Sequence, residues 1–193
     1  AIFVNREYGV IETEKLIVLF SMLLNSGNKN VVSTEICNKG LEENLNNIGY
    51  KLFQTEVGDR IVVETAIKKN AVLGAEPSGH YFFPNCSNTM DGLIAIFYFI
   101  ELLGCYKNNF METIKGLIHY TRIKQDIPLE DTTKINLDSL INNIKPMISN
   151  NNEKLIIRQS MWDPVLRVYY DYKKQNNFEV FENLILDRLQ IKS

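Results

Sequence analysis

Short apolar strand patterns alternate with amphipathic helix patterns between residues 28 and 108, and this alternation constrains the fold more than any other feature. The strand patterns are 2 to 6 residues long and contain mainly Val, Leu, Phe and Tyr, whereas the helix patterns repeat their apolar residues with a period near 3.6. The expected strands are residues 31–33, 50–55, 72–73 and 81–83, and the expected helices are residues 41–48, 60–69 and 92–103. Such alternation predicts a three-layer α/β/α domain with a mainly parallel sheet.

The pattern changes after residue 109. Two apolar strand patterns flank residues 158–167, and helix patterns are expected at residues 137–148 and 178–189. This order indicates a small α+β domain in which a helix backs an antiparallel sheet. We therefore divide the chain into residues 1–27, the tail of an incomplete α/β/α domain; residues 28–108, a second α/β/α domain; and residues 109–193, the α+β domain.

The longest apolar run covers residues 93–103. Asp91 stands where an N-cap belongs, because its carboxylate can accept hydrogen bonds from the free N–H groups of the first turn. The run is too short to span a bilayer, which needs about 20 apolar residues, so it predicts a buried helix and no membrane association.

Charge and cysteine usage exclude other classes. The 193 residues carry a formal net charge of −2 without a basic stripe, so nucleic acid is not an expected partner. The three cysteines, Cys37, Cys86 and Cys105, lack metal-ligand spacing and suggest neither a zinc site nor a disulfide framework. Reduced thiols are typical of a cytoplasmic protein, which is the expected location.

Residues 74–80 read Gly-Ala-Glu-Pro-Ser-Gly-His and have the chemistry of a polyol-binding loop. The Glu76 carboxylate accepts hydrogen bonds from sugar hydroxyls, Ser78 can donate or accept, and His80 can do either near neutral pH. Gly79 stands where a side chain would crowd a ligand, and it lets the backbone approach closely.

Residues 158–167 form a second candidate loop, between the two expected strands. Guanidinium groups match phosphate oxygens in a bidentate geometry, so Arg158 and Arg167 with the Ser160 hydroxyl predict a phosphate site. The ordinary alternative stays open at this point, because arginines near strand ends are commonly solvated or paired with acids.

Together these loops resemble those of the α-D-phosphohexomutase superfamily, whose sugar loop reads Gly-Glu-x-Ser-Gly-His and whose phosphate loop reads Arg-x-Ser-Gly-Thr-Glu-Pro-x-x-Arg. Residues 57–60 (Val-Gly-Asp-Arg) and 88–93 (Asn-Thr-Met-Asp-Gly-Leu) are similar to two further family segments, in the same order. The pattern resembles the phosphoglucosamine mutase branch more than the phosphomannomutase/phosphoglucomutase branch.

The resemblance implies that the chain is the C-terminal portion of a mutase: the end of domain two, then domains three and four. Such an enzyme interconverts glucosamine-6-phosphate and glucosamine-1-phosphate through a phosphoserine and a bisphosphate intermediate, and this feeds cell-wall precursor synthesis. The catalytic serine and the Mg²⁺ ligands would lie in the N-terminal domains of the same protein, so no metal ligand is expected here. The chain alone is expected to be inactive and to bind hexose or hexosamine phosphates.

The resemblance also implies roles for individual residues. Glu76 and Ser78 would hold the sugar hydroxyls, with Gly79 in the same binding loop. His80 lies beside them. His80 is the candidate for assisting proton transfer, although a plain hydrogen-bonding role is the preferred interpretation. Asp59 and Arg60 would line the same cleft. The residues expected to hold the phosphate that is not transferred are Arg158, Ser160, Met161, Trp162 and Arg167.

The phosphate loop departs from the family pattern, because Met161, Trp162 and Asp163 stand where the family has Gly-Thr-Glu. One lost hydrogen bond to a charged group is worth roughly 1.5–3 kcal/mol, so phosphate binding is expected to weaken about tenfold to a hundredfold. Two alternatives remain open: a phosphomannomutase/phosphoglucomutase, or a noncatalytic sugar-phosphate-binding module. The chain is interpreted as a partial sequence, a designed piece or a truncated gene product.

Overall fold

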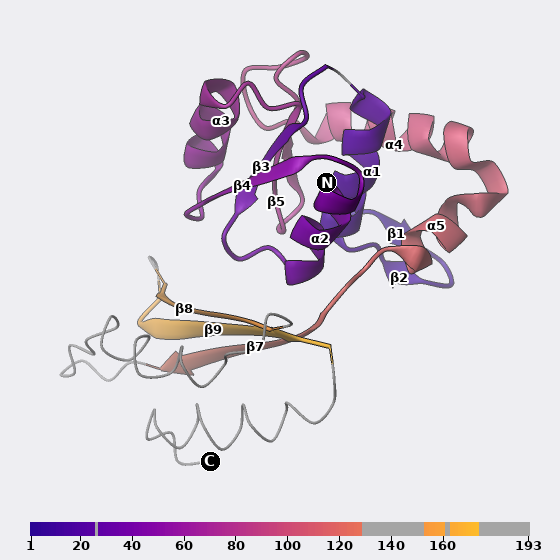
Figure 1. The fold of residues 1–193 in the computed structure, drawn as a ribbon. Coiled ribbons are helices and arrows are strands. Elements are labelled where there is room, and N and C mark those ends of the chain that lie inside the picture. Colours follow the sequence, from indigo (N-terminus) through magenta and orange to yellow (C-terminus); the bar gives the residue numbers. More distant parts are fainter. Residues whose placement is uncertain (26, 129–152, 161–162, 174–193) are drawn as a thin grey trace. The chain divides into compact units, whose positions relative to one another are not determined.

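The computed structural model describes residues 1–25, 27–128, 153–160 and 163–173. The chain forms two compact units, Ala1–His119 and Tyr120–Ser193 (Figure 1). The first unit contains β1 (Val4–Asn5), β2 (Gly9–Val10), α1 (Thr13–Leu24), β3 (Asn30–Thr34), α2 (Lys39–Asn47), β4 (Lys51–Thr55), α3 (Asp59–Lys68), β5 (Leu73–Glu76), β6 (His80–Phe82), α4 (Gly92–Tyr106), the 3-10 turn η1 (Lys107–Asn109) and α5 (Phe110–Gly116).

The sheet of the first unit has the order β4-β3-β5-β6. β3 pairs in parallel with both β4 and β5, and β6 returns antiparallel beside β5. Successive residues of β3 face opposite sides: Val31 packs in the core with α1 and α2, and Val32 packs against Val62 and Ala66 of α3. The mainly parallel three-layer arrangement predicted from the sequence is thus confirmed.

The helix α2 begins with the Asn38 side chain, which accepts a hydrogen bond from the Gly40 N–H, and the chain then turns at Gly49 with a φ of +78°. The helix α4 begins at the expected cap, because the Asp91 carboxylate accepts from the N–H groups of Leu93 (2.8 Å) and Ile94 (3.2 Å). The cap predicted at Asp91 is thus confirmed, whereas α2 begins two residues before its predicted start.

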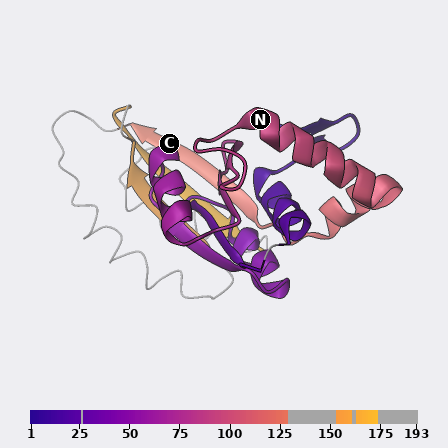
Figure 2. The same cartoon turned by 90° about the horizontal axis from the view of Figure 1, so that it is seen from above.

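The expectation that α4 is a buried helix is wrong for one of its faces. Ala95 and Leu102 are fully buried, but Leu93 and Phe97 on the opposite face are 69% and 72% exposed. The helix lies at the side of the unit away from α3, where α1, α5 and β6 contact it and cover only one of its faces (Figures 1 and 2). An apolar run reveals that a helix is hydrophobic all round, but it does not reveal what covers each face.

The short hairpin of β1 and β2 is antiparallel, with Val4 opposite Val10. Phe3 stacks on Phe99 of α4 with ring centroids 4.1 Å apart, and this contact attaches the hairpin to the unit. No helix in the part of the chain that the structure describes is long and apolar enough to cross a membrane.

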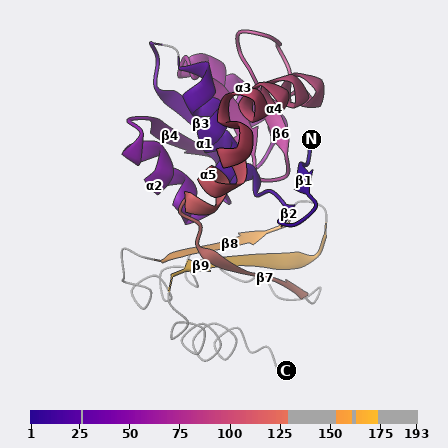
Figure 3. The same cartoon turned by 90° about the vertical axis from the view of Figure 1, so that its right-hand side faces the viewer.

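The second unit contains β7 (Thr121–Pro128), β8 (Lys154–Gln159) and β9 (Val165–Tyr172). All pairings are antiparallel in the order β7-β9-β8, which confirms the predicted antiparallel sheet (Figure 3). A bidentate ion pair joins Arg122 of β7 to the buried Asp171 of β9, at 2.5 and 2.8 Å. The helices expected at residues 137–148 and 178–189 lie outside the described residues.

The predicted boundaries at residues 27 and 108 concern family domains and stay a prediction. The first compact unit runs on through α5 to His119. Asn44 of α2 contributes to this, because its side chain bonds both the N–H and the carbonyl of Ile118.

Candidate functional site

The predicted sugar loop is the turn between β5 and β6, so its polar residues lie at the carboxyl end of a strand in a mainly parallel sheet, where α/β proteins bind ligands. Gly79 has a φ of +87°, which favours glycine, and an added Cβ would lie 2.5 Å from the carbonyl oxygen of Ala1. In the structure, therefore, the backbone of the turn and its contact with Ala1 require this glycine.

Glu76 is the buried centre of the loop, with 6% of its surface exposed. One carboxylate oxygen accepts the Gly58 N–H at 2.9 Å, and the other accepts the Ser78 hydroxyl at 3.3 Å. Buried carboxylates are costly unless they are hydrogen-bonded, so these donors hold Glu76 in place. Ser78 itself is exposed.

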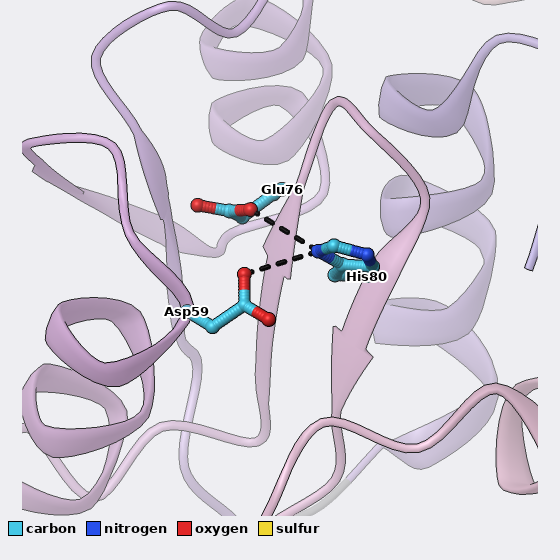
Figure 4. A group of neighbouring side chains, drawn as sticks. All are labelled: Asp59, Glu76 and His80. Atoms are coloured by element: carbon cyan, nitrogen blue, oxygen red, sulfur yellow. Dashed lines mark hydrogen bonds and ion pairs between the residues drawn. The ribbon is translucent and has the colours of Figure 1, made fainter. Parts of the chain in front are cut away.

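His80 lies between two carboxylates that come from different elements (Figure 4). Its Nδ1 is 3.0 Å from Asp59 Oδ1 and 3.4 Å from Glu76 Oε2. Asp59 is the first residue of α3, whereas Glu76 ends β5 and His80 begins β6. About half of the His80 and Asp59 side chains is exposed, so the group is open to solvent on one side. We call Asp59, Glu76, Ser78 and His80 the sugar-loop cluster.

Arg60 follows Asp59, but its guanidinium is directed along α3 rather than into the sugar-loop cluster. Its Nε bonds the Glu64 carboxylate at 2.7 Å, and this hydrogen bond raises the pKa of Arg60. The structure thus brings Asp59 to the loop and leaves Arg60 on the outer surface of the helix.

The ligand atoms of Asp59, Glu76 and His80 lie within 4.8 Å of one another. Mg²⁺ demands near-octahedral oxygen ligands, whereas here an imidazole nitrogen separates the two carboxylates and the Glu76 oxygens already accept protein donors. The arrangement fits a hydrogen-bond network and does not fit a magnesium site.

The predicted phosphate loop connects β8 to β9. Arg158 and Arg167 are direct cross-strand partners, so their side chains emerge on the same face of the sheet. Like charges directly opposite each other are destabilising unless anions lie near them. Among the described residues, the buried Nε of Arg158 has no hydrogen-bond partner.

Protein carboxylates already neutralise Arg167 in part. Its guanidinium bonds Asp163 at 2.8 Å, and its Nε is 3.6 Å from Asp126, which is an ion pair but too long for a hydrogen bond. The buried Ser160 hydroxyl is 3.3 Å from both the Asp163 carboxylate and its N–H. Met161 and Trp162 lie outside the described residues. The two loops belong to different compact units.

The family resemblance placed Asp59 in the same cleft as the sugar loop, but the direct contact of His80 with Asp59, which joins residues 21 positions apart, was not predicted. The available signal was topological. β4, which leads into α3, and β5, which ends at Glu76, are the two neighbours of β3 in one sheet. An acidic residue that opens such a helix lies at the edge where the strands end.

Comparison with known proteins agrees with this geometry. A family model described as phosphoglucomutase/phosphomannomutase, alpha/beta/alpha domain III, matches residues 13–120. The phosphoglucosamine mutase of Hydrogenovibrio crunogenus is 28% identical over 182 residues, which are 91% of this chain and 40% of the relative. The chain therefore spans well under half the length of the curated relatives it matches.

Solved structures show the same fold. A phosphoglucomutase/phosphomannomutase family protein from Burkholderia thailandensis matches with a TM-score of 0.79 and 15% identity, over 100% of this chain and 45% of that chain. Aspergillus fumigatus N-acetylphosphoglucosamine mutase, solved with GlcNAc-6P and magnesium, matches with a TM-score of 0.75 and 11% identity, over 97% and 49%. Since the family model covers more than half of the chain, the chain belongs to the phosphoglucomutase/phosphomannomutase family and carries its alpha/beta/alpha domain III.

Proposed function

We propose that this chain is the substrate-recognition portion of a phosphohexomutase, most specifically a phosphoglucosamine mutase. It supplies the groups that hold a hexosamine phosphate while other domains of the same protein transfer the phosphoryl group. The names of the curated relatives support the glucosamine substrate, and the sugar-loop cluster supports the recognition role.

The observation that carries the proposal is the buried Glu76 carboxylate beside the exposed Ser78 and His80. A sugar presents adjacent hydroxyls that both donate and accept, so it is matched by a fixed acceptor flanked by two groups able to do either. A mutase substrate turns over between its two half-reactions, and a site with acceptors and donors at several positions can hold hydroxyls in both orientations.

His80 would serve as a hydrogen-bonding group whose Nδ1 is fixed by two carboxylates. If Nδ1 carries the proton, Nε2 is left to face the substrate as an acceptor. The same atom is the candidate for taking a proton from a sugar hydroxyl.

The paired arginines supply the phosphate part of the proposal. Arg158 and Arg167 lie directly across from each other, and the phosphate dianion would relieve the repulsion between them. Because Asp163 already bonds Arg167, the phosphate would share this guanidinium with a protein carboxylate. This competition favours modest affinity.

Catalysis would depend on parts of the protein outside these residues. We propose that a phosphoserine and Mg²⁺ are supplied by the N-terminal domains of the same protein, and that the 193 residues alone show no mutase turnover. An A. fumigatus relative was solved with magnesium, whereas the sugar-loop cluster here does not fit this ion. The three cysteines are not in disulfide bonds, which is typical of a cytoplasmic protein, and we propose a cytoplasmic enzyme of cell-wall precursor synthesis.

Two other functions compete with this one. A phosphomannomutase/phosphoglucomutase is favoured by the name of the Burkholderia structure, since few loop residues separate the two branches. A noncatalytic sugar-phosphate-binding module is favoured by the altered residues 161–163 of the phosphate loop.

Calorimetric titration of the purified chain with glucosamine-6-phosphate, glucose-6-phosphate and mannose-6-phosphate tests the proposal. We expect the tightest binding for glucosamine-6-phosphate and no conversion to glucosamine-1-phosphate when Mg²⁺ is added. Tighter binding of glucose-6-phosphate or mannose-6-phosphate would favour a phosphomannomutase/phosphoglucomutase. Turnover by the chain alone would contradict the recognition-only role, and the absence of binding to all three would contradict the proposal itself.

A further inference from the structure

The helix α4 carries an exposed apolar stripe on the face opposite the core. Its members are Leu93, Ile96, Phe97, Ile100 and Leu103, which are between 41% and 72% exposed. We call these five residues the α4 stripe. Apart from Glu101 the helix has no charged residue, so both of its faces are apolar. A helix that is hydrophobic all round is normally covered on all sides.

The spacing of the stripe is that of a helix-pairing seam. Leu93, Ile96, Ile100 and Leu103 are separated by 3, 4 and 3 residues, the a and d pattern of a coiled coil, and Phe97 flanks them. A Cβ added at Gly104, the next position along this face, would meet nothing within 4 Å. The seam is therefore open for another helix to lie along it.

The order of residues in this seam is a palindrome. If a second α4 lies antiparallel, centred on Tyr98, then Leu93 faces Leu103 of the other copy and Ile96 faces its Ile100. Each leucine meets a leucine and each isoleucine meets an isoleucine, so the surface is complementary to itself. Self-complementarity about a two-fold axis is what an isologous dimer interface requires.

From these observations we propose that the α4 stripe is a dimerisation surface, on which α4 of a second copy of this chain packs antiparallel. No charge lies on the stripe to oppose self-association, and antiparallel helices align their dipoles favourably. The exposed parts of the five side chains come to roughly 500 Å² on each copy. A pair would bury about 1,000 Å², the lower end for a specific interface.

This inference goes beyond the proposed function and does not depend on it, because the stripe lies on α4 and the sugar-loop cluster on α3, β5 and β6. The competing occupant is the remainder of a longer phosphohexomutase, since the relatives are more than twice as long as the matched region. That occupant would leave the 193-residue chain monomeric when purified alone.

The test is the mass of the purified chain in solution, measured by light scattering after size exclusion at about 5 to 200 μM. We expect a dimer of two 22.3 kDa chains. Phe97→Asp is expected to weaken dimerisation at least about a hundredfold, because it puts a charge in the centre of an apolar seam. The matched control is Ile67→Asp on α3. Ile67 is also an exposed apolar residue (60%) but lies away from the stripe, so this variant is expected to remain dimeric.

A charge swap tests the antiparallel register. Lysine at both Ile96 and Ile100 is expected to give a monomer, because every cross-pair is then repulsive. Ile96→Lys combined with Ile100→Glu is expected to restore the dimer, because position 96 then faces the opposite charge at position 100. A parallel pair would instead place like charges together and stay monomeric.

Circular dichroism of each variant checks that it is folded. We expect all variants to fold, because the substituted positions are exposed. A monomeric wild-type chain at 200 μM would overturn the proposal, as would a Phe97→Asp variant that dimerises as tightly as the wild type. A dimer that the charge swap fails to restore would overturn the antiparallel register.

Discussion

Replacing Glu76 with glutamine is the perturbation whose effect follows most directly from the site. The carboxylate is 6% exposed, and its oxygens accept the Gly58 N–H at 2.9 Å and the Ser78 hydroxyl at 3.3 Å. Glutamine has nearly the same shape but only one accepting oxygen. It can keep the bond to Gly58, and it then turns an NH₂ group toward the position where sugar hydroxyls are expected.

The size of the effect comes from the loss of a charged acceptor. Hydrogen bonds to charged groups are worth about 1.5–3 kcal/mol, so Glu76→Gln should weaken glucosamine-6-phosphate binding by about 10- to 150-fold. Since the bond to Gly58 survives, the free energy of unfolding should fall by no more than about 1–2 kcal/mol. Calorimetric titration gives the affinity, and urea denaturation gives the stability.

The matched control is Glu64→Gln, which removes an exposed carboxylate of α3 that bonds Arg60. It should leave the affinity within about twofold of the wild type, because surface ion pairs contribute little. If Glu76→Gln binds glucosamine-6-phosphate within threefold of the wild type while remaining folded, Glu76 does not contact the sugar and the reasoning fails.

Three further changes test the phosphate site and the scaffold. Arg158→Ala should weaken glucosamine-6-phosphate binding about tenfold or more but leave binding of unphosphorylated glucosamine unchanged, as titration of both ligands would show. Gly40→Ala should lower the free energy of unfolding by about 2 kcal/mol or more in urea denaturation, because its Cβ would collide with the Ile118 carbonyl; a loss below about 0.5 kcal/mol would refute the contact. Burial acts to raise the pKa of Glu12, but the hydrogen bond from Tyr8 and its other partners outweigh burial and hold that pKa below its ordinary value of 4.5. The stability from this lowered pKa is present above pH 4.5 and is lost as the pH falls through the lower pKa of the folded state. Tyr8→Phe should therefore lower the free energy of unfolding by about 0.5–1 kcal/mol at pH 7 and by almost nothing near pH 2. An equal loss at both pH values, measured by urea denaturation, would contradict the predicted sign.

Much of the first unit could be predicted from local patterns, because each element has its own signal. The β-branched run of β3, the polar caps Asn38 and Asp91, and the turn at Gly49 all act within a few residues of where they stand. The antiparallel return of β6 carried no such signal. It depends on the tight turn at Gly79 and on pairing with β5, which only the folded sheet provides.

The site shows the same division between local and distant information. The residues of the turn, Glu76 to His80, are contiguous, so their nearness was never in question. The contact of His80 with Asp59 and the direction of Arg60 toward Glu64 depend on how α3 is rotated against the sheet. That rotation is set by Val62 and Ala66, which pack against Val32.

The exposed face of α4 is the clearest failure of local information. Hydrophobicity alone predicted burial on all sides, but burial depends on how many neighbours surround the helix. Leu102 meets the core and Phe97 does not, although the two differ little in apolar character.

The most direct test of sugar-phosphate recognition is an NMR titration of the ¹⁵N-labelled chain with glucosamine-6-phosphate, followed at every backbone amide and at the imidazole nitrogens of His80. We predict saturable chemical-shift changes at Gly58, in residues 76–80 and around Arg158 and Arg167. When unphosphorylated glucosamine is titrated instead of glucosamine-6-phosphate, we predict weaker changes, confined to the sugar loop. Unchanged resonances in residues 76–80 at millimolar glucosamine-6-phosphate would show that this loop does not bind the sugar.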